Sequence, residues 1–166
     1  CQSSALIYKD SSIDWCCFPK FDSPSIFAKI IDNSIGGFFK VDTVGNYNIS
    51  QEYFKNTCIL KTSFNNGFDE FHIIDYMPRY QTKKKSYYSP PEITRIIKYI
   101  KGNPKIRITY DPRLDYSIGK TRSYDKSNFI VSISENENYE TLYLYSNASL
   151  NAIINNEVIE SATPSM

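Results

Sequence analysis

Residues 12–25 read Ser12-Ile13-Asp14-Trp15-Cys16-Cys17-Phe18-Pro19-Lys20-Phe21-Asp22-Ser23-Pro24-Ser25 and contain the only tryptophan of the chain. Ile13 and Trp15 alternate with Asp14, as expected of a half-buried strand. Pro19 then removes a backbone donor, and the chain continues as a rigid loop to Pro24. A packed β-corner with Trp15 in the core explains this pattern. Loops on a strand scaffold are also where binding residues tend to lie, so both interpretations stay open.

The remaining sequence also predicts β-structure. Alternation runs through Ile59–Phe64, and Asn66-Gly67 between two alternating segments indicates a hairpin. Turn residues recur at the intervals that an all-β fold needs. The predicted strands are Ser4–Tyr8, Ile13–Cys17, Gly37–Asp42, Tyr47–Phe54, Thr57–Phe64, Phe68–Tyr76, Ile93–Gly102, Lys105–Tyr110, Phe129–Ser134, Thr141–Ser146 and Ser149–Ile154.

Three segments need separate treatment. Pro24–Ile31 is predicted as a short helix, with Ser23 as its N-cap and an apolar face at Ile26, Phe27, Ile30 and Ile31. Glu92–Lys101 fits a helical stripe as well, but its β-branched residues favour a strand. Tyr80–Pro91 is predicted as a polar loop. Together these elements predict an all-β fold, a large antiparallel β-sandwich of two packed sheets.

Three motifs resemble one known family. They occur in the order found in prokaryotic glucoamylase/trehalase-like proteins of glycoside hydrolase family 15. The first is Ser12-Ile13-Asp14-Trp15 with Pro19-Lys20-Phe21-Asp22-Ser23-Pro24-Ser25-Ile26-Phe27, the second is Asp75-Tyr76-Met77-Pro78, and the third is Tyr110-Asp111-Pro112-Arg113-Leu114-Asp115-Tyr116. Lys20 stands where the family pattern usually has arginine, and the two side chains are not equivalent in a bidentate contact.

The resemblance implies that residues 1–166 form a single β-sandwich domain, supersandwich-like, at the N-terminal side of a larger glycosidase. The resemblance further implies that the catalytic (α/α)6 barrel, with the acid and base glutamates, lies outside these residues. The parent enzyme would cleave terminal α-glucosidic bonds with inversion, acting on an α-glucan or trehalose without a cofactor. The barrel would be the partner of this domain.

Composition narrows the remaining function classes. The chain has 166 residues, with 19 basic and 18 acidic side chains, which gives no reason to expect nucleic acid or an anionic membrane as a partner. Cysteines at positions 1, 16, 17 and 58 match no zinc spacing and predict buried thiols in a reducing, cytoplasmic compartment. The chain begins at Cys1 rather than Met, so a removed leader remains open.

Catalytic candidates within the chain are weak. Glycoside hydrolysis needs two carboxyl groups about 6.5–9.5 Å apart when the anomeric configuration inverts. Turn, cap or interface roles explain the candidate carboxylates better. His72, the only histidine, has no nucleophile arranged beside it, and Lys83–Lys85 fits a solvated loop. The carboxylate candidates are Asp14, Asp22, Asp69, Glu70, Asp75, Asp111 and Asp115.

The sequence therefore predicts a non-catalytic domain that docks on the barrel and stabilises it. Trp15, Lys20, Phe21 and Asp22 are its predicted contact residues at the rim of the active-site cleft. A freestanding carbohydrate-binding module is the first alternative, with tyrosines such as Tyr87-Tyr88 as a sugar platform. A structural or interaction protein is the second. Its exposed sheet edges would pair in a homodimer.

Overall fold

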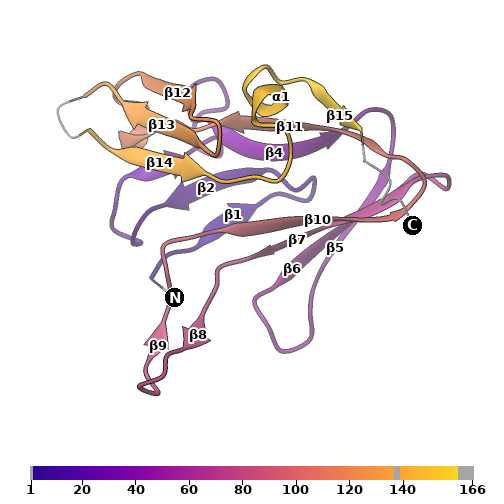
Figure 1. Ribbon diagram of the computed structural model, residues 1–166, viewed down its shortest axis with the longest axis horizontal. Coiled ribbons are helices and arrows are strands. Elements are labelled where there is room, and N and C mark those ends of the chain that lie inside the picture. Colours follow the sequence, from indigo (N-terminus) through magenta and orange to yellow (C-terminus); the bar gives the residue numbers. More distant parts are fainter. Residues whose placement is uncertain (1, 137–138, 161–166) are drawn as a thin grey trace.

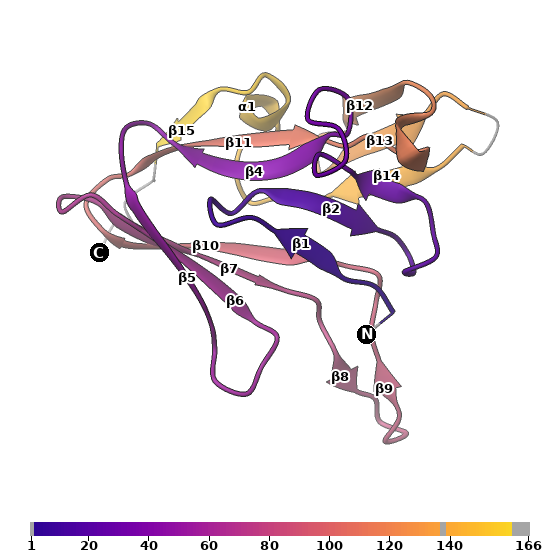
Figure 2. The same cartoon turned by 180° about the vertical axis from the view of Figure 1, so that it is seen from behind.

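The computed structural model describes residues 2–136 and 139–160 and shows an antiparallel β-sandwich (Figures 1 and 2). One sheet has the order β1-β2-β4-β11-β15, with β3 on β2, and the second has the order β10-β7-β6-β5. A third sheet, β12-β13-β14, continues the first layer, and β8 and β9 form a projecting hairpin. All strand pairs in these sheets are antiparallel.

Each main sheet takes its strands from separate parts of the chain. The first sheet contains β1 (Ala5–Ile7), β2 (Ile13–Cys17), β3 (Ser25–Phe27), β4 (Phe38–Thr43), β11 (Lys105–Asp111) and β15 (Val158–Glu160). The second contains β5 (Asn48–Tyr53), β6 (Leu60–Asn65), β7 (Glu70–Tyr76) and β10 (Thr94–Lys101). The others are β8 (Tyr80–Gln81), β9 (Tyr87–Tyr88), β12 (Thr121–Asp125), β13 (Ile130–Ser134), β14 (Thr141–Leu144), a 3-10 turn (Asp115–Ser117) and helix α1 (Leu150–Ile154).

The core lies between the two main sheets. Val41, Ile106 and Ile108 of the first sheet pack in one cluster with Phe64 and Phe71 of the second. The two phenylalanine rings are stacked with centroids 4.6 Å apart. Alternate residues of β6 and β7 are buried, so the predicted alternation and the Asn66-Gly67 hairpin are confirmed. The all-β sandwich is confirmed with them.

The helix predicted over Pro24–Ile31 is wrong. Residues 25–27 form β3, in which Phe27 pairs with Cys16 of β2. On the other side, the Ile26 carbonyl accepts a hydrogen bond from the Arg113 N–H at 2.9 Å. Strand β2 on one side and the segment after β11 on the other therefore bind the backbone groups that a helix would use internally. Ile30 and Ile31 are 61% and 73% exposed, so the expected apolar face does not form.

The strand predicted over Ser149–Ile154 is also wrong, because this segment forms α1. The Ser149 hydroxyl caps the helix by accepting from the Ala152 N–H, and Leu150 and Ile153 join the core. Within Glu92–Lys101 the chain forms β10 (Thr94–Lys101), so the strand favoured there is confirmed. The sequence did not predict β12, β15 or the small β8–β9 hairpin inside Tyr80–Pro91.

The cysteines are only partly where we expected them. Cys16 and Cys17 are buried free thiols in β2, and burial raises the pKa of Cys16 to about 12. Cys58 is exposed, against the prediction, and Cys1 lies outside the described residues.

No helix within the described parts of the chain has the length and apolar character needed to cross a membrane.

Candidate functional site

The three sequence motifs converge at one end of the sandwich. Ile13 and Phe27 of the first motif pack in one buried cluster with Leu114 of the third, and Met77 of the second lies against it. These residues are separated by up to about a hundred positions in the sequence, yet they share one small core. The motifs therefore define a single three-dimensional region, with two exposed segments above it.

The first exposed segment is the loop 18–24, which leaves the end of β2. Its backbone is closed by Ser23, whose N–H donates to the Lys20 carbonyl at 3.2 Å and whose hydroxyl accepts from the Lys20 N–H at 3.1 Å. The Phe21 N–H donates to the Gln2 carbonyl at 2.9 Å. Phe21 is 61% exposed, and Asp22 is exposed beside it. Neither Lys20 nor Asp22 forms an ion pair with any other described residue.

Of the four predicted site residues, the structure groups three. Lys20, Phe21 and Asp22 lie together on this loop, whereas Trp15 lies within β2, half-buried and paired with Leu6 of β1. The tryptophan is thus a partly exposed residue of the strand that leads into the loop, separate from the other three.

The second exposed segment is the turn 114–118, which the sequence did not single out as a surface. Asp115, Tyr116 and Ser117 all have positive φ, at 51°, 56° and 62°. Such left-handed backbone costs roughly 1–2 kcal/mol per residue without glycine, so the surroundings must enforce it. Leu114, 1% exposed, anchors one end, and the buried Asp115 carboxylate accepts a hydrogen bond from the Asn136 amide.

This turn lies against the first loop. Tyr116, 51% exposed, donates its hydroxyl to the Ser23 carbonyl at 3.4 Å. We call the loop 18–24 and the turn 114–118 together the motif loops. Tyr116 joins this site because the third motif lies beside the first in the fold. Sequence spacing does not show that proximity, so the sequence could not predict Tyr116 as a site residue.

The second motif contributes a buried clamp between the two sheets. Asp75 of β7 binds Arg95 of β10 through two hydrogen bonds, Nε to Oδ1 at 2.7 Å and Nη2 to Oδ2 at 3.1 Å. The same guanidinium donates to the Ser11 carbonyl at 2.6 Å and the Phe39 carbonyl at 3.1 Å on the opposite sheet. Only 4% of the Arg95 side chain is exposed. Asp75 is therefore a structural residue.

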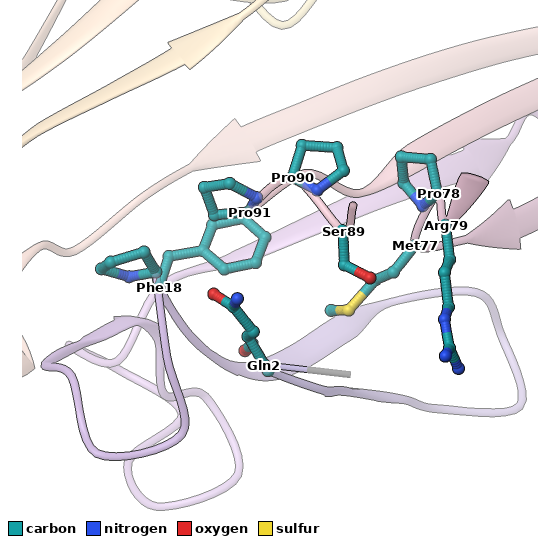
Figure 3. Close-up of a pocket in the computed structure, with 10 residues that line it drawn as sticks. Gln2, Phe18, Met77, Pro78, Arg79, Ser89, Pro90 and Pro91 are labelled. Atoms are coloured by element: carbon teal, nitrogen blue, oxygen red, sulfur yellow. The ribbon is translucent and has the colours of Figure 1, made fainter. Parts of the chain in front are cut away.

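A small pocket lies at the start of the loop 18–24 (Figure 3). Phe18 and Pro19 line it on one side and Met77 and Pro78 of the second motif on the other, and Pro91 lies beside the Phe18 ring. Its volume of about 20 Å³ is close to the minimum needed for one water molecule. The pocket is therefore too small for a sugar ring. Its lining shows that residues of the first and second motifs lie next to each other in the fold.

The other nominated acidic groups are engaged in local contacts. Asp14 lies 3.8 Å from the Lys29 ammonium, and Asp111 lies 3.0 Å from Arg113. The half-buried His72 contacts Glu70 at 3.1 Å within the same strand. A search of residues 2–136 and 139–160 finds no group of His, Cys, Asp and Glu side chains suited to a metal ion. The contacts of Asp14, Asp111 and Glu70 agree with the structural roles that the sequence favoured for these carboxylates.

Exposed aromatic residues gather in two other places. Tyr87 and Tyr88 lie on the projecting hairpin, where Tyr88 meets Tyr80 edge-on and Arg79 lies 4.5 Å from the Tyr87 ring centroid. The second group covers one face of the β12-β13-β14 sheet and was not predicted. It comprises Tyr124, Phe129, Tyr143 and Tyr145, with the Phe129 ring 5.6 Å and 5.4 Å from the rings of Tyr143 and Tyr145.

Comparison with known proteins gives a consistent result. A family model described as trehalase-like, N-terminal, matches residues 1–163. The chain is 31% identical over 137 residues to the trehalase of Thermoplasma acidophilum, covering 80% of this chain and 23% of that protein. It is 40% identical over 75 residues to trehalase 2 of Sulfolobus acidocaldarius, covering 45% of this chain and 13% of that protein.

A more distant relative extends the match along the chain. The trehalase of Mycobacterium tuberculosis is 24% identical, covering 88% of this chain and 24% of that protein. The chain thus spans less than a quarter of the length of these relatives. No solved structure matches it.

Proposed function

This chain belongs to the trehalase-like N-terminal family, and from that premise we propose that it is the non-catalytic N-terminal domain of a trehalase-type glycoside hydrolase. The family resemblance read from the three motifs is confirmed by the family match. The relatives are named trehalases, which favours trehalose over an α-glucan as the substrate of the whole protein. The reaction itself would take place in an (α/α)6 barrel elsewhere in the polypeptide.

The role of this domain, in our proposal, is to dock on that barrel through the motif loops. The observation that supports it is the exposure of Phe21 and Tyr116 on two loops that a shared buried core holds in place. An exposed aromatic side chain on a rigid support is the kind of anchor that interfaces use. Lys20 and Asp22 add unpaired charges beside it, which can set the orientation of docking.

The free thiols of Cys16, Cys17 and Cys58 favour a reducing compartment, and we place the protein in the cytoplasm on that basis.

The full-length protein with Phe21→Ala or Asp22→Ala tests this proposal. If Phe21 is buried against the barrel, its removal costs about 1.5–3 kcal/mol of contact energy, and the thermal midpoint and kcat/KM for trehalose should both fall. Phe68→Ala is the matched control, because Phe68 is 83% exposed in the hairpin at the other end of β7. Such a surface change should stay within about 0.5 kcal/mol.

Two results would overturn the proposal in different ways. If Phe21→Ala behaves like Phe68→Ala in both measurements, the motif loops are not the docking surface. If the unmodified full-length protein hydrolyses no trehalose, the assignment as a trehalase-type hydrolase fails.

A second candidate function is carbohydrate binding by the aromatic face of the β12-β13-β14 sheet. Tyr143 and Tyr145 are 52% and 70% exposed, and aromatic faces bind sugar rings through apolar contacts. Calorimetric titration with trehalose and maltooligosaccharides tests it. Heat that disappears in Tyr143→Ala supports binding on this face, and the absence of heat with both sugars removes the candidate.

A further inference from the structure

The hairpin of β8 and β9 projects from the body of the sandwich (Figures 1 and 2). We call residues 79–88, which contain this hairpin, the arm. In the part of the chain that the structure describes, β8 and β9 pair only with each other. A two-stranded hairpin without further packing is marginally stable in water. A partner surface that covers the arm would therefore stabilise it.

Both faces of the arm carry exposed aromatic side chains. Tyr80 and Tyr88 pair directly and share one face, whereas Tyr87 pairs with Gln81 and lies on the other. Tyr80, Tyr88 and Tyr87 are 53%, 49% and 64% exposed, respectively. A flat partner surface would cover only one of the two faces, so this arrangement favours insertion of the arm into a groove.

The rings of the arm do not form a flat platform for a sugar or a nucleic-acid base. The Tyr80 and Tyr88 rings meet edge to face, with centroids 5.5 Å apart and an interplanar angle of 68°. The Arg79 guanidinium lies over the Tyr87 ring, 4.5 Å from its centroid, and covers one face of it. Sugars and bases stack on open ring faces. Tyrosine and arginine side chains packed on each other are instead the anchors that protein interfaces favour.

The arm is also strongly basic. It has four cationic residues and no acidic residue, although the net charge of the whole chain is only +1. The four cations are Arg79, Lys83, Lys84 and Lys85, and none of them forms an ion pair with another described residue. Two such arms repel each other, so the charges favour an acidic partner over pairing of arms between two copies.

The base of the arm lies next to the motif loops. Pro78 and Pro90, which flank the arm, line the same pocket as Phe18 and Pro19 at the start of the loop 18–24 (Figure 3). One partner can therefore contact the arm and this loop together. A domain of the same polypeptide is favoured as that partner, because its covalent tether gives it a high effective concentration.

We infer that the arm inserts into an acidic groove of the catalytic domain in the full-length protein. The inference rests on the proposed function, because it assigns to the arm the same partner as to the motif loops. It adds a second contact of defined chemistry, in which carboxylates bind the lysines and Arg79 and apolar groups pack around the tyrosines. None of these residues belongs to the three motifs.

Carbodiimide crosslinking of the full-length protein tests the inference, because this reagent joins a lysine amine to a carboxyl group in contact with it. The Lys105–Glu160 pair, 2.7 Å apart, is the internal positive control. Lys55, exposed in the hairpin between β5 and β6, is the reference for a solvated lysine. Amides between residues 83–85 and carboxyl groups of the catalytic domain should exceed those of Lys55 by at least about tenfold, since docking holds the groups together.

Tyr87→Ala tests the aromatic anchor, and Tyr53→Ala is its matched control. The two tyrosines are 64% and 65% exposed, and Tyr53 ends β5 on another part of the surface. Loss of an interface anchor should lower the crosslinking yield of the arm lysines at least about tenfold in Tyr87→Ala. The yield in Tyr53→Ala should equal that of the unmodified protein.

Three results would overturn the inference. The first is a crosslinking yield of the arm lysines no higher than that of Lys55, and the second is an equal yield in Tyr87→Ala and Tyr53→Ala. The third is a crosslink between two copies, detected by mixing isotopically labelled and unlabelled protein, which identifies a second copy as the partner.

Trehalose hydrolysis, measured on an untreated part of the same sample, separates this inference from the proposed function. An active protein without arm crosslinks overturns the role of the arm alone. Arm crosslinks to the downstream domain of a protein that hydrolyses no trehalose overturn the trehalase assignment alone.

Discussion

Breaking the Asp75–Arg95 clamp should destabilise the domain more than any surface change. Arg95→Met leaves the Asp75 carboxylate, 2% exposed, without its counter-ion, and removes both hydrogen bonds to the opposite sheet. Removing one partner of a buried pair costs about 3–5 kcal/mol. That is a large fraction of the roughly 5–15 kcal/mol that stabilises a typical domain. In a chain of this size it lowers the melting temperature by roughly 6–20 °C.

A double-mutant cycle separates the pair from its surroundings. Asp75→Leu alone leaves the guanidinium buried and uncompensated, so it should cost as much as Arg95→Met. The double variant removes both charges, and it should be less destabilised than either single variant. Its remaining cost, about 1–3 kcal/mol, comes from the Ser11 and Phe39 carbonyls that lose their donor.

Urea unfolding followed by the fluorescence of Trp15, the only tryptophan, measures all four proteins. A loss below about 1 kcal/mol in Arg95→Met would refute the argument, because such a value is typical of an exposed ion pair. Additive losses in the double variant would refute it as well, since they would show that the two side chains act independently.

Two further predictions concern individual side chains. Cys58 should react with a maleimide in the native protein, whereas Cys16 and Cys17 should react only after unfolding, because both are buried and burial raises the pKa of Cys16 to about 12. Mass spectrometry of the labelled peptides measures which thiols have reacted. Although burial opposes it, hydrogen bonds from Lys40 and the Ser12 N–H lower the pKa of Asp10. The stability that the Asp10 carboxylate contributes is therefore complete above the ordinary aspartate pKa of 3.8, and it is lost as the pH falls through the lower pKa of the folded protein. Asp10→Asn should therefore make the free energy of unfolding depend less on pH in that acidic range.

The two-sheet architecture was predictable because a strand with one buried face alternates apolar and polar residues along its sequence. Leu60–Asn65 and Glu70–Tyr76 show this, since their inward residues pack together and their turn is specified by Asn66-Gly67. The two errors in element type have a common cause. Residues 25–27 and 150–154 are short apolar segments whose periodicity fits a helix or a strand, and tertiary partners decided between them.

The candidate site was predictable only in part, for a related reason. Phe21 and Asp22 could be proposed from the proline-bracketed loop, which is a local signal. Arg95 as the partner of Asp75 depends on two strands that pair across twenty positions. The left-handed turn at Asp115–Ser117 depends on contacts that hold it in place, and no propensity predicts three such residues in succession.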